Sequence, residues 1–422
     1  MSKILYITQR YAPAAGGAEI YVNALAQWNV KNGHEVDVWT SDALEADALW
    51  YPRRKKIDVM EEKIEGVHVR RFKTSPFFLN NIFINKAIRF ILVRMPFRIL
   101  RIIGSPPLCW EMLREVRKND SFPYDIIHVS AMPYHILFYV GLLLAKKTGA
   151  KLYLTPFAHT GISQKDPLYK KYFDPLIKDF FKKADKVFVQ TDVEQRTLSN
   201  FLEQKGVSLS LDVFQKVGLG VVPGEVLVGD RTRFRAKYGI DPDIPIVFYV
   251  GAREGVKGVY NLVNTCEILW KKGIVFKLVM GGNSSIAFEK FWDRRSEEVK
   301  SNSLVLERPS DEDKWDMFDA GDIFVMTSKS ESFGIVYLEA WLYKKPVIGC
   351  NIEAVSEIIE EGEDGYLLPF DDSQALVEKI EFLLSNKEEA KRLGQNGYNK
   401  VMREYTWENK FKILAPFFND KK

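Results

Sequence analysis

The sequence predicts an α/β protein made of two doubly wound domains and a helical tail. The chain has 422 residues, more than one ordinary hydrophobic core accommodates. Its first 40 residues follow the order strand, loop, helix, strand, which opens a doubly wound sheet. The same alternation begins again after residues 221–230, where Pro223, Gly224 and Gly229 interrupt the pattern.

The first half begins with a short apolar strand at residues 4–8 and a loop at residues 13–17. Apolar residues then follow helical spacing over residues 18–30, and a second strand is predicted at residues 36–40. Three later apolar runs are expected to form strands: residues 126–129, 152–155 and 187–190.

The second half repeats this alternation, with a helix predicted over residues 259–271. Its strands are expected at residues 246–250, 276–280, 304–306, 323–327 and 347–349. Residues 385–422 have helical character, and Trp407, Phe417 and Phe418 could pack this tail back across the first domain. We therefore expect an N-terminal domain at 1–222, a C-terminal domain at 223–404 and a final helix at 405–422.

Composition excludes several classes of protein. Hydrophobic residues make up 46% and charged residues 27%, a globular balance, and a net charge of +4 does not indicate a nucleic-acid binder. The three cysteines (Cys109, Cys266 and Cys350) are odd in number and lack metal-type spacing, which favours a reducing cytoplasm. The N-terminus lacks signal-peptide features, and no uncharged apolar run approaches the roughly 20 residues that span a bilayer.

The first candidate ligand loop is the glycine-rich stretch after the first strand, which contains Gly16 and Gly17. Glycines let the backbone approach a ligand closely, and the helix that follows offers its N-terminus to an anion. The stretch lacks the spacing of the dinucleotide fingerprint and of the P-loop. An ordinary tight turn is the alternative interpretation.

The second candidate loop follows the first strand of the second half and carries Arg253 and Lys257. An arginine fork and a lysine point charge could neutralise a diphosphate here. The alternative is a pair of solvated loop cations.

The third candidate segment holds two carboxylates, Glu331 and Glu339, eight positions apart. It follows the apolar strand at 323–326 and leads through a Phe-Gly pair into an apolar helix, whose free N-terminal N–H groups suit an anion. Glu339 stands between Leu338 and Ala340, and a carboxylate in apolar surroundings usually has a partner. A ribose diol is one such partner, because a carboxylate can accept hydrogen bonds from both hydroxyls. The alternative is that both carboxylates face solvent.

Together these segments resemble the retaining glycosyltransferases of family four, the glycosyl transferases group 1, which have the GT-B fold. The resemblance covers nearly the whole chain, and its specific part is Glu331-x7-Glu339 followed by Lys-Pro-Val-Ile at 345–348. It implies two Rossmann-like domains facing a cleft, with a C-terminal helix that crosses back to the first domain. Ligands bind in such folds at the carboxyl ends of the strands.

The resemblance also implies roles for single residues. Glu339 would hold the ribose hydroxyls, Glu331 would contact the donor sugar, and Arg253 and Lys257 would stabilise the departing phosphate. Family members carry a histidine after a mid-sheet strand of the first domain, which His159 matches; a structural loop histidine is the alternative. The implied catalytic residues are His159, Glu331, Arg253 and Lys257. The implied donor-binding residues are Gly16, Gly17, Arg253, Lys257, Arg308, Glu331, Ser332, Phe333, Gly334, Ile335 and Glu339.

The expected reaction is transfer of a hexosyl group from a nucleotide diphosphate sugar to a hydroxyl. Negative charge develops on the leaving diphosphate, and fixed cations and helix N-termini stabilise it. The resemblance implies retention of anomeric configuration. We expect front-face attack, because neither glutamate is well placed as a covalent nucleophile. No Asp-x-Asp motif lies in a convincing loop, so we expect no metal site and no cofactor.

An uneven distribution of charge indicates a second functional surface. Residues 51–118 carry 16 Lys and Arg against 6 Asp and Glu, a local charge of +10 that leaves −6 for the rest. Within them, residues 77–103 mix large apolar side chains with arginines, a combination that commonly lies on anionic membranes. We therefore expect a glycan or glycolipid acceptor, lipid-linked or presented by a membrane, and a cytoplasmic protein peripheral to the inner face of the cell membrane. A core-facing helix with a solvated basic face is the alternative.

Other functions stay open. A soluble sucrose- or glycogen-type synthase would share the donor site, and a GT-B-fold sugar-nucleotide epimerase would share the architecture without needing an acceptor. A non-catalytic sugar-binding protein could lose Glu331, Lys257 or His159, and all three are present. The missing dinucleotide fingerprint disfavours a dehydrogenase.

Overall fold

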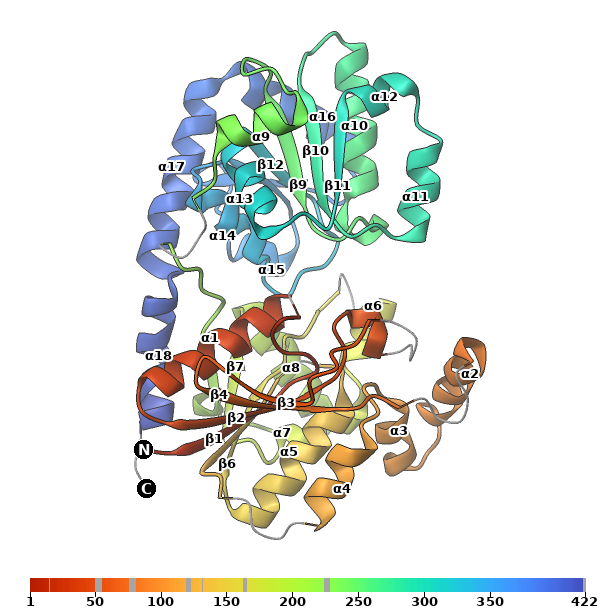
Figure 1. The fold of residues 1–422 in the computed structure, drawn as a ribbon, viewed down its shortest axis with the longest axis vertical. Coiled ribbons are helices and arrows are strands. Elements are labelled where there is room, and N and C mark those ends of the chain that lie inside the picture. The colour runs from red at the N-terminus through yellow and green to blue at the C-terminus, as the bar shows by residue number, and fades with distance from the viewer. Residues whose placement is uncertain are drawn as a thin grey trace. The chain divides into compact units, whose positions relative to one another are not determined.

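Each half of the chain forms its own, largely parallel sheet (Figure 1). The computed structural model describes residues 1–14, 16–49, 55–75, 81–118, 123–130, 132–161, 165–223 and 228–419. The chain divides into a first unit, Met1–Gly218 with Phe411–Lys422, and a second unit, Leu219–Lys410. The boundary between the two units lies after residue 218, whereas the sequence predicts it after residue 222. The chain returns to the first unit at Phe411, which lies within the last helix.

The first unit holds an eight-stranded sheet in the order β3-β4-β2-β1-β5-β6-β7-β8. β3 and β4 form an antiparallel hairpin, and the other neighbours pair parallel. The strands are β1 Lys3–Ile7, β2 Glu35–Ser41, β3 Glu61–Ile64, β4 Val67–Phe72, β5 Ile126–Ser130, β6 Lys151–Thr155, β7 Lys186–Val189 and β8 Phe214–Lys216. The α-helices are α1 Gly17–Lys31, α2 Ile82–Leu92, α3 Arg98–Gly104, α4 Trp110–Lys118, α5 His135–Thr148, α6 Pro167–Tyr172, α7 Lys178–Phe181 and α8 Asp192–Gln204.

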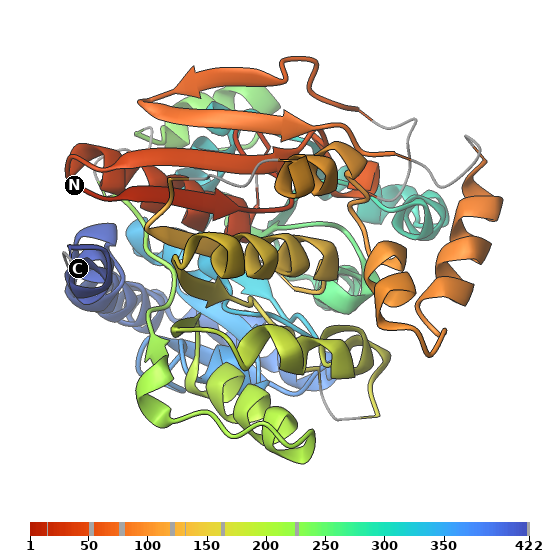
Figure 2. The ribbon, with the colours of Figure 1, turned by 90° about the horizontal axis from the view of Figure 1, so that it is seen from below.

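Two helices of this unit, α2 and α3, lie at its periphery in both Figure 1 and Figure 2. α2 packs on α3, and α3 packs on α5. The side chain of Asn81 caps α2 by accepting from the N–H groups of Phe83 and Ile84. Pro96 lies in the turn between the helices, so the basic apolar stretch forms two helices instead of one. The predicted stretch also includes residues 77–80, which lie outside the described residues.

The second unit holds six parallel strands in the order β11-β10-β9-β12-β13-β14. The strands are β9 Ile246–Val250, β10 Lys277–Gly282, β11 Ser303–Glu307, β12 Ile323–Met326, β13 Val347–Cys350 and β14 Gly365–Leu368. The α-helices are α9 Arg231–Tyr238, α10 Val259–Lys271, α11 Ile286–Asp293, α12 Glu297–Ser301, α13 Asp311–Ala320, α14 Ile335–Leu342, α15 Glu353–Ser356, α16 Ser373–Ser385 and α17 Lys387–Glu404. The strand order changes direction between β9 and β12, and such a point of an open α/β sheet is where ligands bind.

The buried cores explain why the strands could be predicted. All five residues of β9 are buried, and so are Ile4, Leu5 and Ile7 of β1, since an inner parallel strand is covered on both faces. Every strand predicted from an apolar run is present, with bounds shifted by a residue or two. The β3–β4 hairpin, β8 and β14 were not predicted, and β3 and β8 are edge strands with polar residues.

The last helix, α18 (Trp407–Asn419), contributes its second half to the first unit. The ring of Phe411 stacks on that of Trp28, with centroids 4.9 Å apart. The hydroxyl of Tyr153 donates to the carbonyl oxygen of Phe417 at 2.8 Å, and Phe418 is fully buried. The predicted return of the C-terminal helix to the first domain is confirmed.

Candidate active site

In the second unit, the loops after β9 and β12 meet, because neighbouring parallel strands place their carboxyl ends at one edge. Lys257 Nζ donates to Glu331 Oε1 at 2.7 Å, and the two side chains are 24% and 12% exposed. The loops also share a backbone hydrogen bond from Lys329 N to Val256 O at 2.8 Å. Two predicted site residues that are 74 positions apart in sequence are therefore in direct contact.

Glycine at position 258 permits this approach of the two loops. Its φ of +76° lies in the left-handed region, and a Cβ there would stand 2.3 Å from the carbonyl oxygen of Thr327. Any other residue would push the β9 loop away from the β12 loop.

Glu339 lies on α14 and is 5% exposed. Its Oε1 accepts from Lys314 Nζ at 2.7 Å, a lysine on α13. Its Oε2 is buried and has no hydrogen-bond partner among the described residues. A buried acceptor without a donor costs about 1–3 kcal/mol, and a ligand hydroxyl would remove that cost. The carboxylate thus has one protein partner, Lys314 at Oε1, while Oε2 has none among the described residues and could accept a hydrogen bond from a ligand.

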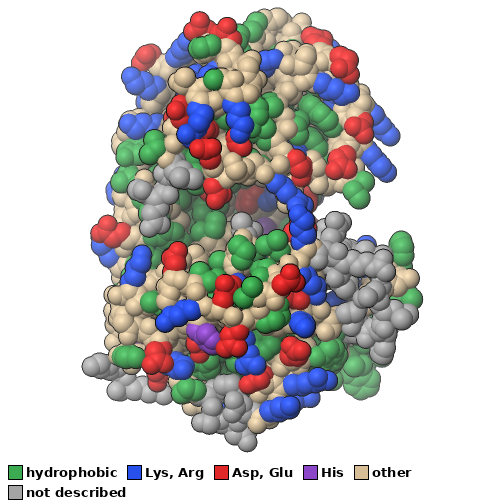
Figure 3. Space-filling model, in the orientation of Figure 1, with side chains coloured by type: hydrophobic (Ala, Val, Ile, Leu, Met, Phe, Trp, Pro, Cys, Tyr) green, Lys and Arg blue, Asp and Glu red, His purple; other side chains and the backbone are tan. Residues whose placement is uncertain are grey.

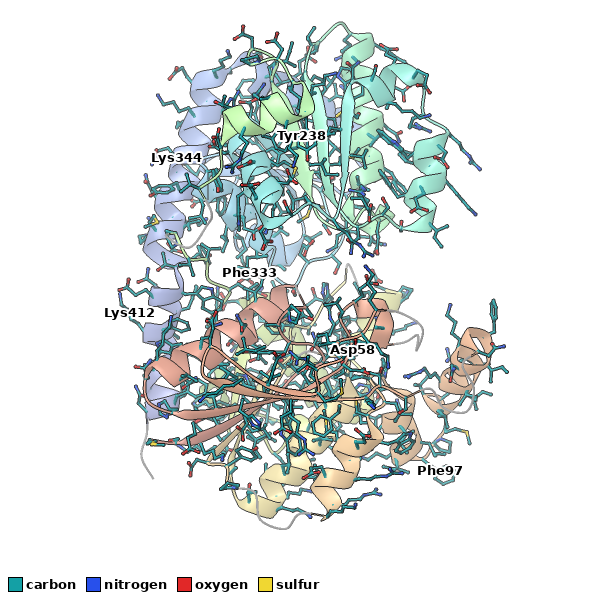
Figure 4. The ribbon with its side chains drawn as sticks, in the orientation of Figure 1. Asp58, Phe97, Tyr238, Phe333, Lys344 and Lys412 are labelled. Atoms are coloured by element: carbon teal, nitrogen blue, oxygen red, sulfur yellow. The ribbon has the colours of Figure 1, made fainter. Side chains whose placement is uncertain are left out.

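The N-terminus of α14 offers backbone donors. The helix begins at Ile335 after Gly334, whose φ is +96°, and no side chain caps it. Tyr337 fixes the helix at the end of β12 by donating from its hydroxyl to Met326 O at 2.6 Å. Phe333, labelled in Figure 4, is buried, whereas Ser332 is partly exposed. Uncapped N–H groups at a helix N-terminus favour an anion.

Arg253, which the resemblance implies would stabilise the departing phosphate, makes its hydrogen bonds within the protein. Its side chain is fully buried and donates to Ser284 Oγ at 2.8 Å, to Leu306 O at 3.0 Å and to Met280 O at 3.3 Å. It also forms an ion pair with Glu307. Burial lowers the pKa of Arg253, an effect that the charge of Glu307 opposes. The guanidinium therefore holds together the ends of β10 and β11, and these contacts favour a structural role.

Arg308, one of the implied donor-binding residues, lies in the loop that follows β11. It has a φ of +50°, and its half-exposed side chain lies 3.9 Å from the Glu307 carboxylate. The loop continues to Ser310, which caps α13, and the first turns of α13 carry Lys314. The loop of Arg308 thus leads directly into the helix that contacts Glu339.

In the first unit, the Gly16–Gly17 stretch joins β1 to α1 and is held by residues that the sequence analysis missed. Glu19, only 3% exposed, accepts from Gln9 Nε2 at 3.0 Å and from Arg10 Nη2 at 2.7 Å. A Cβ on Gly16 would lie 2.3 Å from Glu19 Oε2, so a larger residue at position 16 would require this carboxylate to shift. The sequence did carry a signal for this contact, because Glu19 is an acidic residue in the first turn of a predicted helix and Arg10 lies in the loop before that helix.

His159 follows β6 in the first unit and is partly exposed. Its ring centroid lies 5.1 Å from that of Tyr172. Burial raises the pKa of Tyr172, which keeps its phenol protonated at neutral pH. Gly16, Gly17 and His159 therefore belong to the first unit, and the remaining predicted site residues belong to the second.

Within the described ranges, no group of three His, Cys, Asp or Glu side chains is arranged to hold a metal ion. Among the helices that the structure describes, none combines the length and the apolar character needed to cross a bilayer.

Comparison with known proteins identifies the family. The glycosyl transferase 4-like domain matches residues 16–204, and glycosyl transferases group 1 matches residues 230–400. O-antigen chain mannosyltransferase C of Escherichia coli is 26% identical over 72% of this chain and 77% of that protein. The alpha-D-kanosaminyltransferase of Streptomyces kanamyceticus is 28% identical, but the match covers only 39% of this chain and 43% of that protein.

Solved structures show the same fold. Sucrose-phosphate synthase from Thermosynechococcus elongatus has a TM-score of 0.76 at 19% identity, covering 99% of this chain and 98% of that one. Anabaena HepE, in complex with UDP and glucose, has a TM-score of 0.71 at 16% identity over the whole of both chains. The predicted family and fold are confirmed: the chain belongs to the group 1 glycosyltransferases and has the GT-B fold.

Proposed function

We propose that this glycosyltransferase moves a sugar from a nucleoside diphosphate sugar to a hydroxyl acceptor and retains the anomeric configuration. The observation that carries the proposal is the buried Oε2 of Glu339, which has no hydrogen-bond partner within the described part of the chain. The same segment contains the Lys257–Glu331 ion pair and the uncapped N-terminus of α14. A ribose hydroxyl suits the first of these features, and a diphosphate suits Lys257 and the helix N-terminus.

The proposed reaction needs groups that stabilise a leaving diphosphate. The bond between the anomeric carbon and the phosphate oxygen breaks, and its electron pair passes to that oxygen. The acceptor oxygen bonds to the same face of the carbon, and its proton passes to a phosphate oxygen of the leaving group. Lys257 and the backbone N–H groups of α14 stabilise the charge that develops, in place of Arg253. Glu331 orients the donor sugar, and we assign His159 the role that the resemblance implies, which is to position or polarise that sugar.

A donor and product assay tests this proposal. HepE has also been solved in complex with UDP-glucose, so UDP-glucose is the first donor to try, with GDP and ADP sugars alongside. We expect transfer to a hydroxyl acceptor, an unchanged anomeric configuration by proton NMR, and activity that persists in EDTA. An inverted product would refute retention, and loss of activity in EDTA that Mg²⁺ restores would refute metal independence. Conversion of the nucleotide sugar without an acceptor would favour an epimerase.

We propose a membrane-presented glycan as the acceptor, because α2 and α3 expose large apolar side chains. Phe83 is 77% exposed, Phe90 59%, Ile91 56% and Phe97 61%. Single exposed apolar residues are common, but a cluster on one peripheral helix pair indicates an interaction surface. Figure 4 labels Phe97, and Figure 3 shows side chains of the described residues by type. One relative is an O-antigen chain mannosyltransferase, which supports a glycan acceptor.

The charge of the same surface indicates an anionic bilayer as the partner. Residues 81–110 contain five basic residues and no Asp or Glu. Arg89 is buried and Arg101 pairs with Asp174 at 2.6 Å, whereas Lys86 and Arg94 are exposed. Exposed aromatic and basic side chains together favour the interface of an anionic membrane.

Vesicle co-sedimentation tests the membrane surface. We expect the protein to sediment with phosphatidylglycerol-containing vesicles and less with pure phosphatidylcholine. Replacing Phe83, Phe90 and Phe97 by serine should abolish sedimentation, and Arg94→Glu should weaken it. The matched control is Ile286→Ser on α11, an apolar residue that is 69% exposed. Absence of sedimentation in the unmodified protein, with transfer to soluble sugars intact, would favour the soluble synthase instead.

A further inference from the structure

A buried carboxylate, Glu194, joins the His159 loop to the next strand of the first sheet. β6 and β7 are parallel neighbours, so the loops that follow them lie at the same edge. Glu194 is 1% exposed and stands in the first turn of α8. Its Oε1 accepts from Ala158 N at 2.5 Å, and its Oε2 accepts from Gln190 N at 2.6 Å. One side chain thus bridges two loops through two backbone donors.

The His159 loop has a backbone conformation that needs support. Phe157 has a φ of +49°, in the left-handed region that aromatic residues rarely adopt. Its ring packs edge-on against that of Tyr21, with centroids 5.3 Å apart. Ala158 follows directly, and its N–H is the group that Glu194 holds. The hydrogen bond therefore fixes the direction in which the chain continues to His159.

Glu194 is itself fixed in place. Thr191 caps α8, and its Oγ accepts from Glu194 N at 3.1 Å. The carboxylate is thus part of a short, capped helix start that follows directly after β7. Because the start of α8 is fixed at the end of β7, the hydrogen bond from Ala158 to Glu194 also fixes the His159 loop relative to the sheet.

We propose that Glu194 is a positioning residue for sugar transfer, which orients His159 by holding the N–H of Ala158. The proposal rests on the proposed role of His159 in the reaction. Glu194 itself is buried, so its proposed effect on the substrate is indirect. Its removal should therefore lower the rate of transfer while leaving unchanged the binding of the nucleotide, which we assign to Glu339 and Lys257.

The test compares Glu194→Gln with Glu203→Gln, an exposed glutamate near the end of the same helix. Glutamine keeps the size of the side chain but replaces one acceptor oxygen by an NH₂ group, which cannot accept a backbone N–H. We expect kcat to fall about ten- to hundredfold in Glu194→Gln, with the donor KM unchanged, because hydrogen bonds to charged groups are strong. Glu203→Gln should match the unmodified protein.

A double-mutant cycle separates positioning from a general loss of stability. In the His159→Ala background, Glu194→Gln should cause no further loss of kcat, because its effect passes through His159. With ¹³C-labelled histidine, Glu194→Gln should shift the His159 ring signal and leave those of His34 and His68 in place. If Glu194→Gln does not fold, Glu194→Asp takes its place, since its shorter carboxylate cannot reach both donors.

The outcomes distinguish the two proposals. An unchanged kcat in folded Glu194→Gln, or an additive loss in the double variant, would overturn the positioning role. An unchanged His159 signal would overturn it as well. If His159→Ala alone retains full turnover, it is the role of His159 in the proposed function that fails, and the positioning role of Glu194 falls with it.

Discussion

Replacing Glu339 by glutamine tests the donor site at one atom. The amide oxygen of glutamine can take the place of Oε1 and still accept from Lys314. The amide nitrogen then occupies the place of Oε2, the buried oxygen that has no partner among the described residues, and nitrogen cannot accept a hydroxyl proton there. The change therefore removes the open acceptor and keeps the shape of the side chain.

The expected magnitude follows from the kind of bond that is lost. A hydrogen bond to a charged group contributes about 1.5–3 kcal/mol, and 1.4 kcal/mol is a factor of ten in Kd. Loss of one hydroxyl contact should thus weaken nucleotide binding about ten- to hundredfold. The free energy of unfolding should change by no more than about 1 kcal/mol, since Lys314 keeps an acceptor and its side chain is 25% exposed to water.

Isothermal titration with UDP and with 2′,3′-dideoxy-UDP measures this effect. The unmodified protein should bind dideoxy-UDP weakly, and Glu339→Gln should weaken UDP binding but not dideoxy-UDP binding further. Glu378→Gln, on the exposed side of α16, is the control. If folded Glu339→Gln binds UDP as tightly as the unmodified protein does, Glu339 holds no ribose hydroxyl and the reasoning from its unpaired oxygen is wrong.

Three further predictions concern the second unit and the core of the first. Lys257→Met should lower kcat about 10²- to 10³-fold, because it removes a fixed cation from the leaving phosphate. Arg253→Met should instead lower the free energy of unfolding by about 2–4 kcal/mol, because it leaves buried carbonyl groups without a donor. Steady-state kinetics and urea titration measure the two effects, and an equal loss of kcat in both variants would contradict the prediction. Burial lowers the pKa of His128 to about 3 and that of His135 to about 4, from 6.5. As the pH falls below 6.5, these histidines therefore take up protons in the unfolded chain before they do so in the folded protein. The free energy of unfolding should then fall by about 1.4 kcal/mol per pH unit for each histidine. Urea titrations down to about pH 5 measure this slope, and His128→Gln should reduce it. Phe418→Ala, in the fully buried end of α18, should cost about 3–5 kcal/mol in a urea titration, and a loss below about 1 kcal/mol would show that this helix contributes little.

The fold could be predicted because its signals are local. An inner parallel strand such as β9 must be apolar along its whole length, so its sequence is sufficient to identify it. The β3–β4 hairpin lacks such a run. Its turn at Glu65 and Gly66, both with positive φ, is a local signal that the prediction passed over.

The site could be predicted only in part, because direction and partner depend on residues far away in sequence. Arg253 and Lys257 lie in one loop and carry the same charge, yet Lys257 faces Glu331 while Arg253 turns inward to Glu307. Nothing in residues 250–258 distinguishes the two side chains, since the acceptors that separate them come from β11 and from the loop after β12. The sequence indicated that Glu339 needs a partner, but only the fold shows that Lys314 is one.

The comparison of Arg253 with Glu339 suggests which property selects a binding residue among buried charged groups. Both side chains are removed from water, which is costly unless hydrogen bonds compensate. Arg253 makes its compensating bonds within the protein, to carbonyl oxygens, a hydroxyl and a carboxylate, so a ligand would have to replace bonds that already exist. Glu339 leaves one oxygen without a described donor, so a ligand hydroxyl adds a bond and breaks none. Because a ligand gains affinity only from the difference between its bonds and those it displaces, the incompletely bonded carboxylate is the better binding group, although the arginine carries the charge that a phosphate prefers.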